Sequence, residues 1–306
     1  MEDVPPAVKH PGQIPLVIPV PAYLREHRAD GRCVLPAAEA LQILARTLPP
    51  AYDARRQEGA QFSHLLIVDE AAARIEAVHE VEPLPGGGCR SRLTTRRTGR
   101  RTACTRRIEH ACVHFPAVRG AGTDTGEETT TARERAVRGA SGEGRRDDED
   151  TTRQDTAPFV VPGARLYEEL VPFGPAWRNV TGEVCLTSAG AAAALSGGRF
   201  PEADGPLGSP FPFDAAMHVA CAWGQRYRGV VAFPVGFDRR EILFPTSSGG
   251  RYVCRVSPLA DEGATLRFDF QIDDEKRRAV EVIRGLRMRD ISGGRRIPPA
   301  WVREGV

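Results

Sequence analysis

One long stretch poor in large apolar side chains divides this chain and constrains its fold more than any other feature. Residues 120–155 (GAGTDTGEETTTARERAVRGASGEGRRDDEDTTRQD) consist mainly of Gly, Thr, Arg, Asp and Glu. Such a segment cannot bury enough apolar surface to offset the entropy of ordering it, so we expect a disordered linker. The sequence therefore predicts two folded parts, residues 1–119 and 158–306, joined by a linker over 120–157.

The two parts share the same order of expected elements. In the first, the extended run IPLVIPV leads into PAAEALQILARTL, whose apolar side chains fall on one helical face: Ala38, Leu41, Leu44 and Leu48. Strand-like runs follow, namely FSHLLIV, ARIEAVHEV and RRIEHACVHF. In the second, the helical run DAAMHVACAWGQRY precedes the strand-like runs VVAFPVGF, REILF, RYVCRV, LRFDFQI and AVEVIRGLRM. Each part is thus predicted to be one buried helix wrapped by an antiparallel sheet, which is an α+β architecture.

Composition excludes several classes of protein. Hydrophobic residues make up 41% and charged residues 27% of the chain, and its formal charge of +2 gives no overall attraction to nucleic acid or to membranes. The start, MEDVPPAVKHPGQIPLVIPVPAYL, has no basic segment before its apolar run, and prolines interrupt that run, so neither a signal peptide nor a membrane span is expected. The seven cysteines contain no CxxC pair, which favours a reducing, cytoplasmic location.

The segment HRADGRCVLP places His27 and Gly31 just before an apolar helix. Pro36 is predicted at the first helical position, where its missing N–H costs nothing. The start of that helix would direct free N–H groups and the positive end of its dipole towards His27 and Gly31. This arrangement would polarise a carbonyl oxygen while an imidazole acts as a base.

The second apolar helix carries a carboxyl group near its start. Asp214 lies in FPFDAAMH with His218 one helical turn later on the same face. A carboxyl in such a first turn can accept backbone N–H bonds or be held protonated by apolar surroundings, and the neighbouring Phe211 and Phe213 favour a dry pocket. A base on one helix and an acid on the other suit the removal of a proton and a hydroxyl from adjacent carbons.

These residues form motifs in a particular order along the chain. His27, Gly31 and Pro36 match the pattern HxxxGxxxxP, Asp214 and His218 match DxxxQ/H, and FGPAW at 173–177 is similar to YGPxF. The chain in this respect resembles polyketide-synthase-type dehydratases. The resemblance implies a double hotdog fold and the dehydration of a 3-hydroxyacyl thioester carried on the phosphopantetheine arm of an acyl carrier protein.

The resemblance also implies roles for individual residues. His27 would take the α-proton, Asp214 would protonate the leaving β-hydroxyl, His218 would orient Asp214, and the Gly31 amide would bind the thioester carbonyl. The positions implied to contact substrate are Gly31, Pro36, Phe173, Gly174, Pro175 and Trp177. No metal or redox cofactor is implied. Phe173 replaces the tyrosine of the family pattern and so removes a hydroxyl from the pocket.

Partners and alternative functions follow from the same resemblance. The chain carries no synthase or carrier sequence, so an acyl carrier protein and a polyketide or fatty-acid synthase are expected to act in trans, and a homodimer stays open. A product-template-like cyclase and an enoyl isomerase would use a similar pair of residues. A non-catalytic protein that binds carrier partners is the alternative outside enzymology.

Two further patterns are weaker. His110, Cys112 and His114 alternate and would share one face of a strand, but no fourth zinc ligand is evident, so we expect a plain strand without metal. The stretch from Arg90 to Arg107 would either attract an acidic carrier protein or form a solvated hairpin. It lacks interleaved aromatic residues, so nucleic-acid binding is not expected. Its six candidate arginines are Arg96, Arg97, Arg100, Arg101, Arg106 and Arg107.

Overall fold

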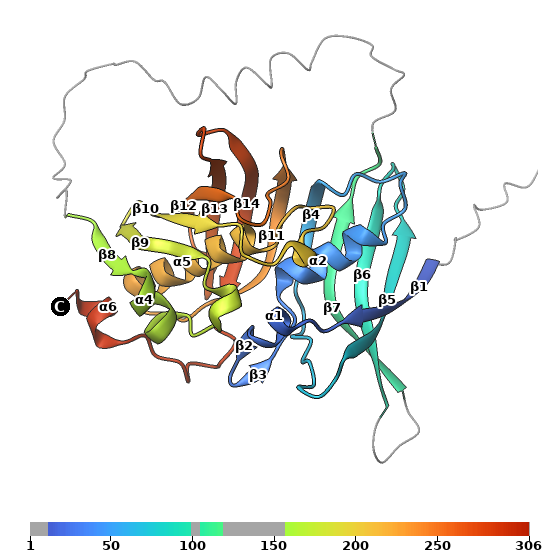
Figure 1. Ribbon diagram of the computed structural model, residues 1–306, viewed down its shortest axis with the longest axis horizontal. Helices are drawn as coiled ribbons and strands as arrows, with labels where there is room; N and C mark the ends of the chain where they lie inside the picture. Colours follow the sequence, from blue (N-terminus) through green and yellow to red (C-terminus); the bar gives the residue numbers. More distant parts are fainter. Residues whose placement is uncertain (1–11, 99–104, 119–156, 306) are drawn as a thin grey trace, which may run out of the picture.

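The computed structural model describes residues 12–98, 105–118 and 157–305. Its main feature is one continuous sheet of twelve strands in the order β1-β5-β6-β7-β4-β11-β14-β13-β12-β10-β9-β8. Strands from the first part of the chain occupy one side of this sheet and strands from the second part occupy the other (Figure 1). The predicted linker lies almost entirely outside the described residues, so its boundaries stay a prediction.

The first half contains a curved sheet and one main helix. Its elements in chain order are β1 (Gly12–Pro19), α1 (Ala22–Arg25), β2 (Arg28–Ala29), β3 (Arg32–Cys33), α2 (Ala37–Arg46), β4 (Arg56–Gln61), β5 (Arg74–Pro83), β6 (Cys89–Thr98) and β7 (Thr105–Phe115). The alternating residues Leu93, Ala111 and Val113 are fully buried beneath α2. The predicted runs at IPLVIPV, ARIEAVHEV and RRIEHACVHF are therefore confirmed as β1, β5 and β7.

The second half repeats this plan with a longer helix. Its elements are β8 (Phe159–Pro162), α4 (Gly163–Arg165), the π-helical turn η1 (Leu166–Leu170), the 3₁₀ turns η2 (Pro175–Trp177) and η3 (Pro201–Ala203), α5 (Phe211–Arg228), β9 (Val180–Thr187), β10 (Gly190–Ser196), β11 (Phe233–Ile242), β12 (Arg251–Pro258), β13 (Thr265–Asp274), β14 (Ala279–Arg289) and α6 (Ala300–Glu304). In Figure 1 the strands of this half curl around α5. Each half thus has the predicted helix-in-sheet form, and the α+β double hotdog prediction is confirmed.

Most of the surface of both central helices is covered. Every residue of α5 from Phe211 to Gln225 is buried, which explains why its sequence is apolar on nearly all sides. The helix ends at Gly229, whose positive φ of 65° suits a residue without a side chain. Helix α2 begins after Pro36, which is its N-cap rather than its first residue, and ends before Leu48. The predicted helix over residues 36–48 was thus slightly too long at both ends.

The halves meet where β4 pairs with β11, and a buried ion pair lies at this seam. Arg240 of β11 donates from Nε to Glu281 Oε1 of β14 at 2.7 Å and from Nη1 to Gln57 Oε1 of β4 at 3.4 Å. All three side chains are almost completely buried. The Arg240 guanidinium also lies 3.9 Å from the ring centre of Phe213 in α5. The seam therefore ties the sheet to the start of the second helix.

Three sequence predictions about strands were wrong or incomplete. The run FSHLLIV is not a strand of the sheet, because the backbone bonds of its later residues go to residues 33–35 instead: Leu35 N–H donates to Leu66 O and Val68 N–H donates to Cys33 O. The runs VVAFPVGF and REILF form a single strand, β11. Strand β10 was missed because its sequence GAAAALS lacks the β-branched residues typical of strands.

Within the ranges that the structure describes, no helix combines the length and apolar character needed to cross a membrane.

Candidate active site

A cavity of about 840 Å³ lies between the two halves and is lined by both. Most of its wall is apolar, with Leu35, Val171 and Met217 among its side chains. The three predicted catalytic residues converge on it: His27 from the first half, and Asp214 and His218 from α5. An apolar chamber with a few converging polar groups is the usual form of a small-molecule site.

His27 follows α1 and is held by the main chain of the next strand pair. Its carbonyl accepts the Val34 N–H at 3.0 Å, and its ring Nδ1 lies 3.0 Å from the Val34 carbonyl oxygen. Because a carbonyl oxygen only accepts, Nδ1 must carry the proton, which leaves the lone pair on Nε2. Nε2 lies 3.9 Å from Oδ1 of Asp214. The geometry thus turns the unprotonated nitrogen of His27 towards the Asp214 carboxyl.

Burial makes the His27 imidazole reluctant to become charged. It lowers the pKa of His27 from 6.5 to about 4, although the nearby Asp214 works in the opposite direction. We expect the ring to stay neutral on acidification until about pH 4, as followed by NMR titration of its ring nuclei. A midpoint near 6.5 would contradict the buried environment.

The same shift has a consequence for stability. An unfolded His27 binds a proton at about pH 6.5, whereas the folded one does so only near pH 4. Its contribution to stability is therefore complete above pH 6.5 and is lost as the pH falls from 6.5 to about 4. The buried His79, whose pKa burial also lowers to about 4, acts in the same direction.

Asp214 and His218 face each other across one turn of α5. His218 Nε2 lies 3.0 Å from Asp214 Oδ2, at ion-pair distance, but Oδ2 makes no hydrogen bond of good geometry within the described structure. The Asp214 side chain is only 6% exposed and borders the cavity. A buried carboxyl with an incompletely satisfied oxygen can exchange a proton with a bound hydroxyl.

The FGPAW segment clamps the two halves together behind His27. Gly174 N–H donates to the Glu26 carbonyl at 2.9 Å, Ala176 N–H donates to the Glu26 carboxylate, and Trp177 Nε1–H donates to the Tyr23 carbonyl at 2.8 Å. A Cβ on Gly174 would lie 2.6 Å from the Glu26 Cβ, so only glycine permits this approach. Glu26 was not singled out from the sequence, although it directly precedes His27.

The clamp places two aromatic rings against the His27 imidazole. Phe173 stacks on it with centroids 4.3 Å apart and planes at 15°, and Trp177 meets it edge-on at 5.1 Å. Phe173 also lies 4.9 Å from the His218 ring. Phe173 lines the cavity, whereas Gly174, Pro175 and Trp177 lie behind its wall. Of the FGPAW residues, only Phe173 is therefore placed to contact a bound molecule.

Gly31 has a different position from the one predicted. With Asp30 it forms the turn between β2 and β3, and both residues have positive φ, 52° and 74°, as a two-residue hairpin of type I′ requires. Gly31 is exposed and does not line the cavity, so its amide is not part of the cavity wall, and its contact with a thioester carbonyl stays a prediction. The hairpin instead brings Val34 beside His27, where the two residues form their hydrogen bonds. Pro36 also lies outside the cavity wall, beside the lining residues Leu35 and Ala37.

Tyr167 was missed by the sequence analysis and touches the site from behind. It belongs to η1, is 3% exposed, and its hydroxyl lies 3.3 Å from Nδ1 of His218. The run LYEEL offered one signal, an aromatic residue among acidic ones, but nothing in its local pattern indicated the partner. That contact is made across 51 positions of the chain.

The residues His110, Cys112 and His114 do not share one face as predicted. The pairing of β6 with β7 shifts between Leu93 and Thr94, which leaves His110 as the extra residue of a bulge. His110 lines the cavity and contacts Thr95 and the His64 carbonyl, while His114 accepts from Arg90 on the opposite face. In the described ranges, no three His, Cys, Asp or Glu side chains are grouped as a metal site.

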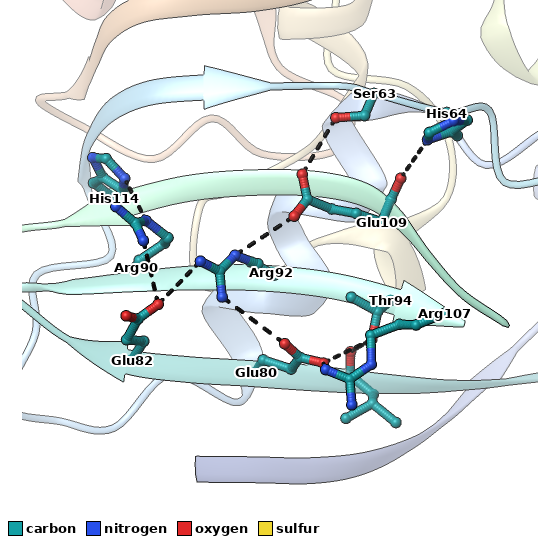
Figure 2. A network of polar contacts seen from close by, with 11 residues as sticks. Ser63, His64, Glu80, Glu82, Arg90, Arg92, Thr94, Arg107, Glu109 and His114 are labelled. Carbon is teal, nitrogen blue, oxygen red and sulfur yellow. Dashed lines mark hydrogen bonds and ion pairs between the residues drawn. The ribbon is translucent and has the colours of Figure 1, made fainter. Parts of the chain in front are cut away.

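The basic stretch lies on the hairpin of β6 and β7, and several of its arginines are neutralised (Figure 2). Arg92 contacts Glu82 at 3.0 Å and Glu109 at 3.5 Å, and Arg107 contacts the buried Glu80. Arg96 and Arg106 are exposed on the hairpin. The side chain of Arg97, and all of Arg100 and Arg101, fall outside the described residues, so attraction of a carrier protein stays a prediction.

Comparison with known proteins agrees with this geometry. The model of a family described as the polyketide synthase dehydratase N-terminal domain matches residues 146–297, which include Asp214 and His218 but not His27. No curated protein matches the chain.

Solved structures match nearly the whole chain. The dehydratase domain of a mycocerosic acid synthase-like polyketide synthase is 15% identical with a TM-score of 0.65, covering 91% of this chain and 92% of that one. The dehydratase domain of RzxB from Pseudomonas fluorescens is 16% identical with a TM-score of 0.62, covering 90% and 94%. The dehydratase domain from the CurF module of curacin polyketide synthase is 12% identical with a TM-score of 0.64, covering 96% and 95%.

Identities of this size establish a shared fold, and coverage of 90% or more of this chain means that the matched structures extend over both halves. The family match adds a sequence relationship over the half that carries the carboxyl group. Together with the residues that converge on the cavity, these findings place the chain in the polyketide-synthase-type dehydratase family.

Proposed function

We propose that this protein removes water from a 3-hydroxyacyl thioester to give a 2-enoyl thioester, with His27 as base and Asp214 as acid. The observation that carries the proposal is the pair itself. Nε2 of His27 and Oδ1 of Asp214 lie 3.9 Å apart at the wall of a largely apolar cavity, although they come from opposite halves of the chain. A positioned base and acid of this kind contribute about 10²–10⁴-fold to a rate.

The proposed reaction uses each group once. Nε2 of neutral His27 accepts the α-proton, and the electrons of the Cα–H bond form the carbon–carbon double bond. The Cβ–O bond breaks while protonated Asp214 gives its proton to the departing hydroxyl, which leaves as water. The products are an imidazolium and a carboxylate 3.9 Å apart. Their mutual attraction stabilises this state, and return of the proton from His27 to Asp214 restores the starting forms.

The neutral state of His27 supports its part in this proposal. Burial lowers the pKa of His27 to about 4, so the ring is unprotonated at neutral pH and its Nε2 lone pair is available. The stacked Phe173 ring excludes water from one face of the imidazole. A dry site strengthens the electrostatic interactions within it.

Arginines in the cavity wall suit a substrate carried on a phosphopantetheine arm. Arg28 of the first half and three arginines of the second line the cavity: Arg287, Arg289 and Arg296. Guanidinium groups are suited to phosphate oxygens because they can donate two parallel hydrogen bonds. Arg28 and Arg296 are held in place by Glu70 and Asp30. We infer that an acyl carrier protein, from a polyketide or fatty-acid synthase, delivers the substrate.

The test is incubation with a 3-hydroxyacyl carrier protein, followed by mass spectrometry of the acyl group. We expect a loss of about 18 Da, one water, as acid–base elimination requires. His27→Ala should abolish the loss. His114→Ala is the matched control and should leave it unchanged, because His114 lies on the outer face of the sheet against Arg90.

The outcome also separates the alternatives. A cyclase would leave a simple 3-hydroxyacyl substrate intact, and an isomerase would act only on a 2-enoyl or 3-enoyl thioester supplied in its place. A protein that binds carrier partners without catalysis would hold the substrate unchanged. Undiminished dehydration by His27→Ala would show that the reaction uses another base.

A further inference from the structure

The Tyr167 hydroxyl occupies a defined place between a backbone N–H and the second histidine of the site. It accepts the Val180 N–H at 2.8 Å and lies 3.3 Å from Nδ1 of His218. Burial raises the pKa of Tyr167 well above its ordinary value, so the group keeps its O–H. Since the backbone N–H already donates to the oxygen, the hydroxyl proton is available for His218.

This arrangement fixes which nitrogen of His218 carries a proton. In a neutral imidazole one nitrogen donates and the other accepts. If Nδ1 donated to Tyr167, the buried Tyr167 O–H would lack an acceptor in the described structure, which costs about 1–3 kcal/mol. With Tyr167 as the donor, Nδ1 accepts and the His218 proton resides on Nε2. That N–H lies against Oδ2 of Asp214, 3.0 Å from the nitrogen.

The two oxygens of Asp214 therefore have different surroundings. Oδ2 faces the N–H of His218, and a proton on Oδ2 would be opposed by the hydrogen already on that nitrogen. Oδ1 faces the unprotonated Nε2 of His27 at 3.9 Å. The contact at Oδ2 is not aligned as a hydrogen bond here, and such contacts often tighten only when substrate is bound. The acidic proton is consequently favoured on Oδ1.

We propose that Tyr167 is a positioning residue that holds His218 in its Nε2–H tautomer and thereby keeps the acidic proton of Asp214 on the oxygen turned towards His27. The role in turnover rests on the proposed dehydration, whereas the tautomer does not. His27 and His218 are then held in opposite tautomers, with the proton on Nδ1 in His27 and on Nε2 in His218. As a result, the His27 side of the site accepts a proton and the Asp214 side donates one.

The tautomers are measured directly in the resting protein by ¹⁵N NMR of the histidine rings. We expect the wild type to show His218 protonated on Nε2 and unprotonated on Nδ1, with the reverse pattern for His27. In Tyr167→Phe, His218 should lose this preference and show a mixture or the Nδ1–H form. A wild-type His218 with its proton on Nδ1 would overturn the proposal, whatever the activity.

Turnover provides the second readout. Tyr167→Phe should lower kcat by about 10- to 100-fold, the usual effect of losing a group that orients a catalytic side chain, with KM changed less than twofold. An unchanged kcat, or a raised KM at constant kcat, would contradict a positioning role. If the wild type shows the stated tautomers yet does not dehydrate, the proposed function fails while the tautomer assignment stands.

Tyr252→Phe is the matched control. Its hydroxyl accepts the Ser247 N–H at 2.9 Å, as that of Tyr167 accepts the Val180 N–H, and its side chain is also buried. Tyr252 belongs to β12 and does not line the cavity. Tyr252→Phe should therefore lose about as much free energy of unfolding as Tyr167→Phe, as measured by urea unfolding. It should leave kcat and the His218 tautomer unchanged. A similar fall in kcat in both variants would refute a specific role for Tyr167.

Discussion

Asp214→Asn is expected to slow water loss by about 10²–10⁴-fold, because an amide cannot supply the proton that the departing hydroxyl needs. The substitution keeps the size of the side chain and an oxygen that can still face His218. Since the side chain is only 6% exposed, replacing its carboxyl by a neutral group of equal size should leave the fold intact. Single-turnover kinetics with a 3-hydroxyacyl thioester provide the measurement.

A change of leaving group distinguishes the acid from the base. A substrate with fluoride at the β-carbon needs little protonation to expel its leaving group, so Asp214→Asn should lose much less activity on it. His27→Ala should be impaired on both substrates, because each requires removal of the α-proton. Asp261→Asn, a change in an exposed ion pair with Arg228, is the control. Equal losses of Asp214→Asn on both substrates would argue against its role as acid.

Glu281→Ala should cost about 3–5 kcal/mol of stability, because it leaves the buried charge of Arg240 without its partner. Arg240 and Glu281 are 2% and 1% exposed, so water cannot replace the lost carboxylate. The hydrogen bond from Arg240 to Gln57 remains, but it is long, at 3.4 Å, and neutral. Urea unfolding followed by circular dichroism gives the change in free energy.

Two further variants show whether burial of the ion pair is responsible for the loss of stability in Glu281→Ala. Asp261→Ala breaks the exposed pair with Arg228 and should cost less than about 1 kcal/mol. Replacing Arg240 and Glu281 together by Met and Leu removes both charges and should restore most of the stability lost by Glu281→Ala. A loss below about 1 kcal/mol for Glu281→Ala would mean that water reaches the seam.

The repeated helix-in-sheet plan could be predicted from local patterns. Burial dictates where apolar residues recur, so the runs that became β5, β7, β12, β13 and β14 were visible in the sequence. The run FSHLLIV shows the limit of this reasoning. Its alternation is real, since Leu66 and Val68 are buried while Leu65 and Ile67 are exposed. Alternation reveals which side chains face inwards but not which segment supplies the backbone partners.

Polar residues on α2 reveal a second limit. Glu39 and Gln42 lie between the apolar positions of this helix, yet both are buried. Glu39 accepts a hydrogen bond from Tyr23, and Gln42 bonds to the backbone at Leu207 and Gly208 in the other half. A periodic pattern cannot show that a second half covers this face.

Site residues could be predicted where a motif combined residue type with spacing. They could not be predicted where contacts between distant residues, or turns of the backbone, determine which side chains reach the cavity. His27, Asp214 and His218 converge as the motifs indicated. The HxxxG spacing predicted Gly31 at the substrate, but the spacing serves the hairpin that brings Val34 back to His27. Tyr167 and Glu26 act on the site through contacts that no local pattern encodes.

The hydrogen bond from His27 to the Val34 carbonyl has a consequence for how this scaffold can diverge. The partner that orients the base is a peptide oxygen, which every amino acid at position 34 would provide. On the opposite wall, orientation depends on the side chains of Tyr167 and His218, which a single codon change can remove. Descendants of such a chain would therefore retain the orientation of His27 most easily, and change would come first on the wall that carries Asp214 and His218.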